Sequence, residues 1–170
     1  MNNRRQAFEA QALPHLDAAY NLARWLARSD PDAEDIVQDA MLRAFRAFES
    51  FRGDSFRPWL LAIVRNCWRN RMGSPGRRLM VGAEEAGLEN FPSAEPDPEN
   101  AAMHVSEARR LNLIMALLPD NIREVLVLRE MEDLSYQEIA DTVGIPIGTV
   151  MSRLARARAM LREKWIEGGA

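Results

Sequence analysis

Apolar positions recur at helical spacing along almost the whole chain of 170 residues. No stretch shows the sustained alternation of apolar and polar side chains that is typical of a half-buried strand. The predicted helices cover residues 7–28, a segment that starts near Pro31, residues 58–72, 99–118 and 121–131, and a helix–turn–helix over residues 134–165. The pattern therefore predicts an all-α fold.

The helical pattern is interrupted between residues 73 and 98, where Gly, Pro and acidic residues are frequent. Such a composition is typical of linkers rather than of packed elements. We therefore expect two small helical domains, residues 1–72 and 99–170, joined by a flexible linker over residues 73–98.

Local signals mark the turn between the last two helices. Ser135 and Glu138 have the S-x-x-E spacing of a capping box, which begins a helix. Gly144 supplies the permissive backbone that a sharp turn needs. Pro146 stands where the next helix begins, and there its missing N–H costs little. Together these signals predict a helix–turn–helix.

The last predicted helix has two contrasting faces at 100° per residue. Its apolar side, which is expected to pack on the preceding helices, consists of Val150, Leu154, Ala157, Leu161 and Trp165. The opposite side is small around Ser152 and Ala155 and carries Arg156 one turn on. Small residues let a helix sit deep in the DNA major groove, and arginine can bond guanine through two hydrogen bonds. The flanking positions, where phosphates would lie, are Arg153, Arg158 and Arg162. The alternative is an amphipathic helix whose arginines are solvated.

The helix that starts near Pro31 also has two distinct faces. Its predicted buried stripe consists of Ala33, Ile36, Val37, Ala40, Ala44 and Ala47. Its outer face collects Asp35, Gln38, Asp39, Leu42, Arg43 and Arg46. A leucine among acidic side chains suits a protein partner that presents basic side chains and an apolar notch. Single exposed leucines are also ordinary on protein surfaces, so that alternative stays open.

The helix over residues 58–72 follows the polar loop FRGDSF. It is predicted to bury Trp59, Leu60, Ile63 and Cys67, which makes an inert thiol the expectation for this cysteine. It is expected to expose Arg65, Asn66 and Arg69, with Trp68 toward the same side. A polar loop beside a basic helix with aromatic residues could hold an unstacked base and the backbone of a single strand. The alternative is that the tryptophans are core residues, and Trp59 is assigned to the core.

Charge is distributed unevenly, although the whole chain has a formal net charge of −3. Two long stretches, residues 55–83 and residues 142–162, contain no acidic residue. Two separate basic faces suggest two contacts with one polyanion. Two ordinary solvated helix faces are the alternative.

Several classes of function find no support in the sequence. His15 and His104 lie in separate segments, and no group of residues suggests a metal site, a nucleophile or a phosphate loop. We therefore expect a chain that is not an enzyme and has no catalytic residues, metal, cofactor or small-molecule substrate. No apolar run approaches the roughly 20 residues that cross a bilayer, and the first residues lack the apolar core of a secretory signal. Together with the single cysteine, this favours a cytoplasmic chain that is not embedded in a membrane.

Two segments resemble one protein family: DAEDIVQDAMLRAFRAFESFRGDSFRPWLLAIVRN and, after the linker, LPDNIREVLVLREMEDLSYQEIADTVGIPIGTVMSRLARARAMLRE. In this order they closely resemble the extracytoplasmic-function (ECF) class of bacterial sigma factors. The resemblance covers about residues 10–72 and 104–164 and implies a region 2 helical bundle and a region 4 helix–turn–helix. It implies a chain that binds core RNA polymerase and directs promoter-specific initiation. Region 4 would read the −35 element, and region 2 would open and read the −10 element. The alternatives are a stand-alone helix–turn–helix transcriptional regulator and a helical adaptor that binds only proteins.

The resemblance also implies roles for individual residues. The positions that correspond to the contact with the β′ clamp helices of the polymerase are Asp35, Gln38, Asp39, Leu42 and Arg46. The positions that correspond to −10 recognition are Asp54, Ser55, Phe56, Arg65, Asn66 and Arg69. The positions that correspond to −35 recognition are Thr149, Met151, Ser152, Arg153, Ala155 and Arg156. Met151 and Ala155 depart from the residues that many relatives have there, which leaves the promoter sequence open.

The same resemblance implies further partners. Region 4 is expected to touch the polymerase β flap through the apolar faces around Leu126 and Leu128. An anti-sigma factor is expected as well, and a membrane-bound one would hold the cytoplasmic chain at the inner membrane face. A flexible coil of the linker's length spans about 28 Å on average, whereas promoter elements about 17 base pairs apart are separated by about 58 Å. We therefore expect the free chain to bind promoters weakly, and the polymerase to hold the two domains apart.

Overall fold

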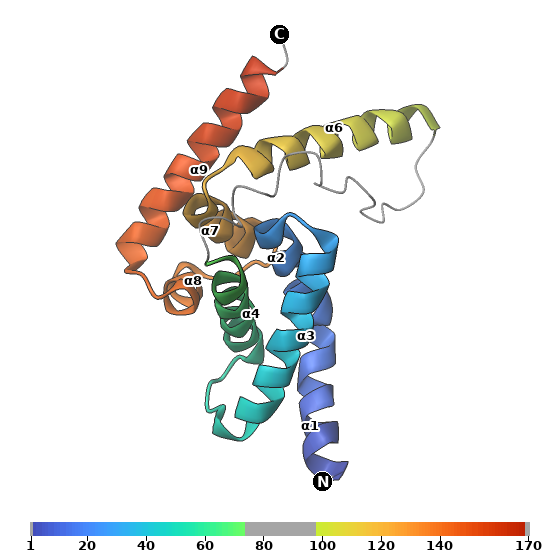
Figure 1. The fold of residues 1–170 in the computed structure, drawn as a ribbon. Coiled ribbons are helices and arrows are strands. Elements are labelled where there is room, and N and C mark those ends of the chain that lie inside the picture. The colour runs from blue at the N-terminus through green and yellow to red at the C-terminus, as the bar shows by residue number, and fades with distance from the viewer. Residues whose placement is uncertain (1, 74–97, 169–170) are drawn as a thin grey trace.

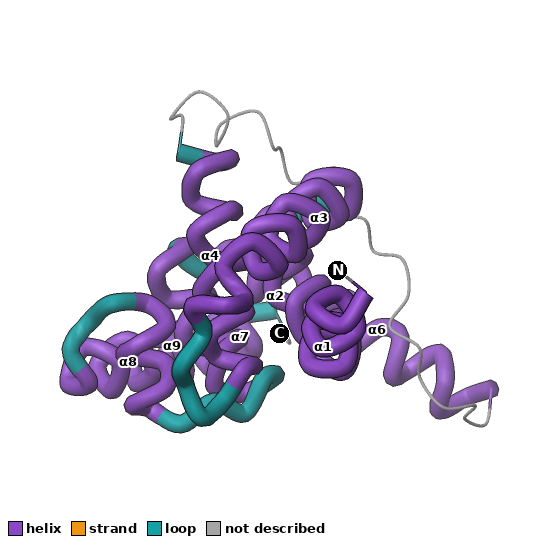
Figure 2. Tube along the Cα trace, turned by 90° about the horizontal axis from the view of Figure 1, so that it is seen from below, coloured by secondary structure: helices purple, strands orange, loops and turns teal. Residues whose placement is uncertain are grey.

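The computed structural model describes residues 2–73 and 98–168, which form helices joined by turns (Figure 1). The N-terminal bundle consists of α1 (Asn2–Ala12), α2 (Leu16–Ala27), α3 (Asp30–Ala47) and α4 (Phe56–Met72), with the 3-10 turns η1 (Leu13–His15) and η2 (Phe48–Ser50). The C-terminal bundle consists of α6 (Pro98–Leu117), α7 (Asp120–Glu130), α8 (Tyr136–Val143) and α9 (Ile147–Glu167). No strand occurs among these described residues (Figure 2), and the predicted all-α fold is confirmed. Of the predicted linker over residues 73–98, residues 74–97 lie outside the described part of the chain.

The single helix predicted over residues 7–28 is wrong, because the chain breaks around Pro14. α1 ends at Ala12 and α2 begins at Leu16, with η1 between them. Pro14 has no backbone N–H, and its ring clashes with the preceding turn of an α-helix, so it is accommodated in the first turn of a new segment. Figure 1 shows α1 running away from α2 toward the N-terminus at the bottom of the view.

Capping explains where α3 begins. Ser29 is the N-cap, and its Oγ accepts a hydrogen bond from the backbone N–H of Asp32 at 3.4 Å. Pro31 stands in the first turn, and Asp30 and Asp32 suit the positive end of the helix dipole. The predicted buried stripe of this helix is confirmed except at Ala47, which is only half-buried.

The predicted helix–turn–helix is confirmed over α8 and α9. Ser135 Oγ accepts a hydrogen bond from the N–H of Glu138 at 3.1 Å, and the Glu138 carboxylate accepts one from the N–H of Ser135 at 2.8 Å. Both halves of the capping box are therefore present. Gly144 follows α8 with a φ of 75°, in the left-handed region, and its N–H donates to the carbonyl of Ala140 at 2.8 Å.

The apolar side of α9 is shorter than predicted. Val150, Leu154 and Ala157 are buried. Leu161 is half-buried, and Trp165 is 39% exposed. The C-terminal end of α9 extends beyond the rest of the bundle in Figure 1, so it has fewer neighbours to pack against.

The two bundles share one apolar core. α2 packs against α7, and α4 packs against α8. Buried side chains of both bundles, such as Leu22 and Leu128, belong to a single cluster. Figure 1 accordingly shows α7 and α8 beside α2 and α4. One side of α2 and one side of α4 are therefore covered by the C-terminal bundle.

Candidate functional surfaces

The residues predicted to read duplex DNA lie along the outward side of α9. Met151, Ser152, Ala155 and Arg156 are exposed, whereas Thr149 and Arg153 are half-buried. Ser152 Oγ donates to the carbonyl of Thr149 at 3.0 Å, which ties this side chain to its own helix. Arg156 forms no hydrogen bond or ion pair with the described residues. A free guanidinium beside small side chains can enter a major groove and bond base edges.

Arg158, which was predicted to flank this face, turns back toward the bundle. Its Nη2 donates to Glu130 Oε1 of α7 at 2.9 Å. Hydrogen bonds with Glu130 and Tyr136 raise the pKa of the Arg158 guanidinium. Arg158 therefore ties α9 to α7 instead of facing outward with Arg156.

The outer face of α3 is exposed as predicted. The exposed positions are Asp35, Gln38, Asp39, Leu42, Arg43 and Arg46. Arg43 Nε donates to Asp39 Oδ1 at 3.2 Å, and Arg71 Nη2 of α4 donates to Asp35 Oδ2 at 2.8 Å. Both acids therefore already have a cation beside them. Leu42, which is 58% exposed, is the apolar projection of this polar face.

The loop before α4 rests on aromatic rings. Asp54 and Ser55 are exposed, whereas Phe56, another of the residues assigned to −10 recognition, is only 7% exposed. Its ring centroid lies 5.1 to 6.3 Å from those of Phe8, Phe48, Phe51 and Trp59. Phe56 is therefore a core residue that holds the loop in place from beneath.

Part of the basic face predicted on α4 is covered. Asn66 and Arg69 are exposed. The predicted exposure of Arg65 and Trp68 is wrong, since they are 7% and 4% exposed. Arg65 donates to both carboxylate oxygens of Glu124, from Nε to Oε2 at 2.7 Å and from Nη2 to Oε1 at 3.2 Å. Because Glu124 belongs to α7, the C-terminal bundle is what covers this side of α4.

A second buried glutamate joins the same two bundles. Glu132 follows α7 and is 3% exposed. Its Oε2 accepts a hydrogen bond from Arg57 Nη2 of α4 at 2.8 Å, and its Oε1 accepts one from Asn21 Nδ2 of α2 at 2.8 Å. Both carboxylate oxygens thus have a partner in the N-terminal bundle, which a buried charge requires.

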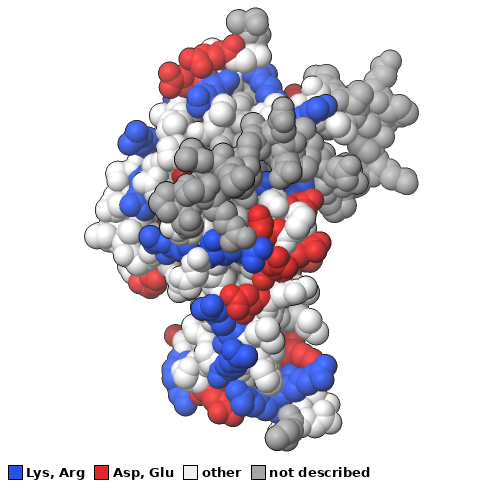
Figure 3. Space-filling view, in the orientation of Figure 1, with Lys and Arg blue, Asp and Glu red and all other residues white. Residues whose placement is uncertain are grey.

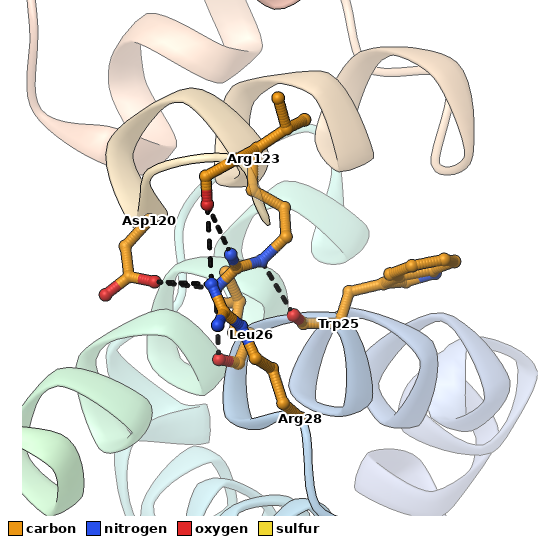
Figure 4. Close-up of polar contacts among 6 residues, drawn as sticks. Trp25, Leu26, Arg28, Asp120 and Arg123 are labelled. Carbon is orange, nitrogen blue, oxygen red and sulfur yellow. Dashed lines mark hydrogen bonds and ion pairs between the residues drawn. The ribbon is translucent and has the colours of Figure 1, made fainter. Parts of the chain in front are cut away.

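The Arg123 side chain of α7 also points into the N-terminal bundle, toward the C-terminal end of α2 (Figure 4). It is 1% exposed, and its Nε donates to the carbonyl of Trp25 at 2.9 Å while its Nη2 lies 3.5 Å from the carbonyl of Leu26. The last carbonyls of a helix carry the negative end of its dipole, where a cation is favoured. Burial, assisted by the nearby Arg28, lowers the pKa of Arg123 to about 10 against the pull of Asp120. The guanidinium therefore stays charged at neutral pH.

Sequence reasoning missed this interface between the bundles. It treated α7 as a helix with an outward apolar face around Leu126 and Leu128, but these are 3% and 0% exposed. The available signal was the run of four apolar residues from Val125 to Leu128. In the structure every residue from Ile122 to Leu128 is buried, including two charged ones. A helix that is apolar almost all round is typical of a central position.

The thiol of Cys67 is buried as predicted, with 2% exposure. Burial, followed by the charge of Asp39, raises the pKa of this thiol to about 11. Thiolate, which is the reactive form, is therefore scarce at neutral pH.

Among the residues whose side chains the structure describes, 2–73 and 105–168, no three His, Cys, Asp or Glu residues come together as a metal site. Within the same described residues, no helix has both the length and the apolar character to traverse a membrane. Figure 3 shows acidic and basic side chains intermixed over the face in view, not divided into two halves. Attraction for an anion would therefore come from local groups such as Arg156 rather than from the charge of the whole chain.

Two family models match the chain. The sigma-70 region 2 model matches residues 13–78, and the sigma-70 region 4 model matches residues 108–161. Their order is the one predicted from the sequence. A match to region 2 disfavours the alternative of a stand-alone helix–turn–helix regulator.

Sequence similarity to relatives with a known name extends over most of the chain. It is 34% identical over 149 residues to the ECF RNA polymerase sigma factor SigE of Mycolicibacterium smegmatis, covering 88% of this chain and 58% of that protein. It is 35% identical over 150 residues to the ECF RNA polymerase sigma-E factor of Haemophilus influenzae, covering 84% and 78%. It is 39% identical over 142 residues to that of Escherichia coli, covering 78% and 73%. The chain thus spans less than two thirds of the mycobacterial relative's length.

Solved structures share the fold. The sigma factor RpoE in complex with the anti-sigma factor NepR from Bartonella quintana superimposes with a TM-score of 0.76 at 27% identity, covering 94% of this chain and 97% of that one. CnrH, in complex with the cytosolic domain of CnrY, gives a TM-score of 0.67 at 24% identity, covering 98% and 91%. At this sequence identity, the similarity to CnrH supports a shared fold only.

Proposed function

Because the chain belongs to the ECF family of RNA polymerase sigma factors, we propose that it directs initiation through surfaces on three helices. α3 holds core RNA polymerase, α4 and its preceding loop engage the −10 element, and α9 reads the −35 element. The observation that carries the proposal is Arg156, which is exposed and unpaired beside the small side chains of the α9 face.

The −35 element is a DNA duplex in this proposal, and α9 enters its major groove. Arg156 bonds a base edge, while Ser152 and Ala155 allow close approach of the helix. Thr149, Met151 and Arg153 border the same face and contact the neighbouring bases or phosphates.

Core polymerase is held by the outer face of α3. Leu42 inserts into an apolar notch of the β′ clamp helices, and Asp35, Gln38, Asp39 and Arg46 form its polar rim. Exposed charge pairs at a rim contribute modestly to affinity. The leucine is therefore the main anchor of this contact.

Melted −10 strand is engaged beside the loop before α4. Asp54 and Ser55 contact an extruded base, and Asn66 and Arg69 contact the strand. Phe56 supports the loop from the core. Arg65 takes part only when it is released from Glu124.

We assign residues 1–72 to polymerase binding and −10 recognition, residues 73–98 to the linker, and residues 99–170 to −35 recognition. The chain serves as a specificity subunit rather than an enzyme, and it acts in the cytoplasm. Its partners are the β′ clamp helices and β flap of core polymerase, promoter DNA, and an anti-sigma factor. The complex of the similar Bartonella quintana sigma factor with NepR supports the last of these.

In vitro transcription with purified bacterial core polymerase over a promoter library tests this function. We expect the chain to bind the core and to select a set of promoters that share an upstream and a downstream element. A chain that does not bind the core, or that leaves promoter selection unchanged, would overturn the proposal.

A further inference from the structure

Two arginines of α4 are bound by buried carboxylates that come from the other bundle. Arg65 holds Glu124 through two hydrogen bonds, of 2.7 and 3.2 Å. Arg57, two helical turns earlier, holds Glu132 at 2.8 Å. The Glu124 and Glu132 side chains are 3% and 4% exposed. These are the contacts by which α7 and the turn after it neutralise one side of α4.

We propose that Glu124 and Glu132 are internal competitors of nucleic acid, which occupy Arg65 and Arg57 in the free chain and release both arginines to the phosphates of the promoter strand when the bundles separate. This inference rests on the proposed function. It adds Arg57 as a nucleic-acid contact and assigns an inhibitory role to the interface between the bundles.

The chemistry of the two arginines suits either a carboxylate or a phosphate as partner. A guanidinium presents a planar fork of N–H donors that matches a carboxylate and a phosphate equally well. Arg65 uses its Nε and Nη2 on Glu124, and its side chain is only 8% exposed, so a phosphate cannot reach it while the bundles are packed together. Arg57 remains 33% exposed in its pair with Glu132, and nucleic acid can therefore approach it first.

The position of the two arginines points to nucleic acid as the competing ligand. Eight residues along an α-helix correspond to a rise of about 12 Å, so both arginines can follow one strand. Asn66 and Arg69 are exposed on the same helix, next to Arg65. The acid-free stretch of residues 55–83 contains no carboxylate that could pair with these arginines once α7 has moved away.

Buried ion pairs also suit an interface that has to open. The desolvation of two charges offsets much of their attraction, so such a pair specifies one arrangement more than it stabilises it. Separation of the bundles returns all four charged groups to water or to a new partner. Closed and open forms can therefore exchange, and a ligand that binds only the open form shifts the population toward it.

The test compares the full chain with the variant Glu124→Gln/Glu132→Gln, which keeps the shape of both side chains and removes their charge. The probe is a fluorescein-labelled single strand of 20 nucleotides with random sequence, and binding is followed by fluorescence anisotropy. We expect the variant to bind about 10-fold more tightly, and small-angle X-ray scattering to show a larger radius of gyration. Because each released phosphate contact adds about 0.7 to the salt slope for single strands, the slope should steepen by about 1.4.

Two further variants make the test specific. The matched control is Glu163→Gln/Glu167→Gln, which removes two exposed charges from the same bundle and should leave binding within about 2-fold of the wild type. Adding Arg57→Ala and Arg65→Ala to the double glutamine variant should abolish its gain in affinity.

Three results would overturn the inference: a variant that stays closed, an open variant with no gain in affinity, or a gain that survives the loss of both arginines. Should the double variant fail to fold, Glu132→Gln alone is the substitute, because its partner Arg57 is partly exposed. A gain of about 3-fold is then expected, and no gain counts against the inference. No polymerase is present in this assay, so its failure leaves the proposed function standing, and failed initiation by the wild type would be a separate result.

Discussion

Glu124 of α7 binds Arg65 of α4 through both carboxylate oxygens, at 2.7 and 3.2 Å, across the boundary between the two bundles. The two residues are 59 positions apart in the chain. One of them is a residue that sequence reasoning assigned to DNA. The closed arrangement therefore conceals part of the surface that the proposed function needs.

Replacement of Arg156 by alanine should change which −35 sequences are preferred. Arg156 is the exposed, unpaired arginine of the α9 face. Loss of one arginine–base contact costs about 1–3 kcal/mol at the base concerned and relaxes specificity there. Transcription from a library randomised over the −35 element, with core polymerase, measures the effect.

The control for this experiment is Arg162→Ala, which removes an exposed arginine from the edge of the same helix. It should weaken transcription from all sequences to a similar degree, as expected for a phosphate contact. An unchanged −35 preference in Arg156→Ala would show that α9 does not read bases through this residue.

Substitution of Leu42 and Asp39 together by alanine should reduce the affinity for core polymerase at least about 10-fold, as expected when an interface anchor is removed. Leu42 is 58% exposed, and the ion pair of Asp39 with Arg43 lies at the surface, so the free energy of unfolding should change by less than about 0.5 kcal/mol. Size-exclusion binding assays and urea denaturation measure the two effects.

Leu113→Ala, at a 47% exposed leucine of α6, is the matched control and should leave core binding intact. Full core affinity in the double variant would exclude the α3 face as the docking site.

The turn of the helix–turn–helix depends on the backbone of Gly144. Its φ is 75°, and a Cβ added there would meet no atom within 4 Å, so strain comes from the backbone alone. Gly144→Ala should lower the free energy of unfolding by about 1–2 kcal/mol. Gly148→Ala, in the first turn of α9 with equally open space, should raise it by up to about 1 kcal/mol. Equal effects of the two substitutions in urea denaturation would contradict this explanation.

Cys67 should behave as an inert thiol. Burial and the nearby Asp39 raise its pKa to about 11, so at pH 8 only about one thiol in a thousand is ionised. Alkylation by iodoacetamide should be at least about 100-fold slower in the native chain than in urea, and it should accelerate as the pH rises toward 11. Rapid labelling of the folded chain at pH 8 would instead indicate a reactive cysteine.

Features that depend on a few neighbouring residues could be predicted from the sequence. The capping box of Ser135 and Glu138 and the left-handed Gly144 involve interactions within one helical turn, and both are present. The break at Pro14 carried an equally local signal that the interpretation of one long helix overlooked. The exposed face of α3 followed from helical periodicity alone.

The covered face of α4 could not be predicted in this way. A single sequence gives no spacing rule for Arg65 and Glu124, because their contact depends on how two distant bundles pack. A charged residue is expected at the surface by default. Phe56 was assigned to a loop contact, although an aromatic ring at the start of a helix also gains by joining the rings of Phe8 and Phe51.

The most direct test of the account is the distance between the two bundles, measured in the free chain and in the initiation complex. Spin labels can be placed at Gln11→Cys of α1 and Gln137→Cys of α8, both exposed positions, in a Cys67→Ala background. Pulsed electron paramagnetic resonance should give one short distance for the free chain. In complex with core polymerase and promoter DNA it should give a much longer one, in keeping with elements about 58 Å apart. The same short distance in both states would contradict the account.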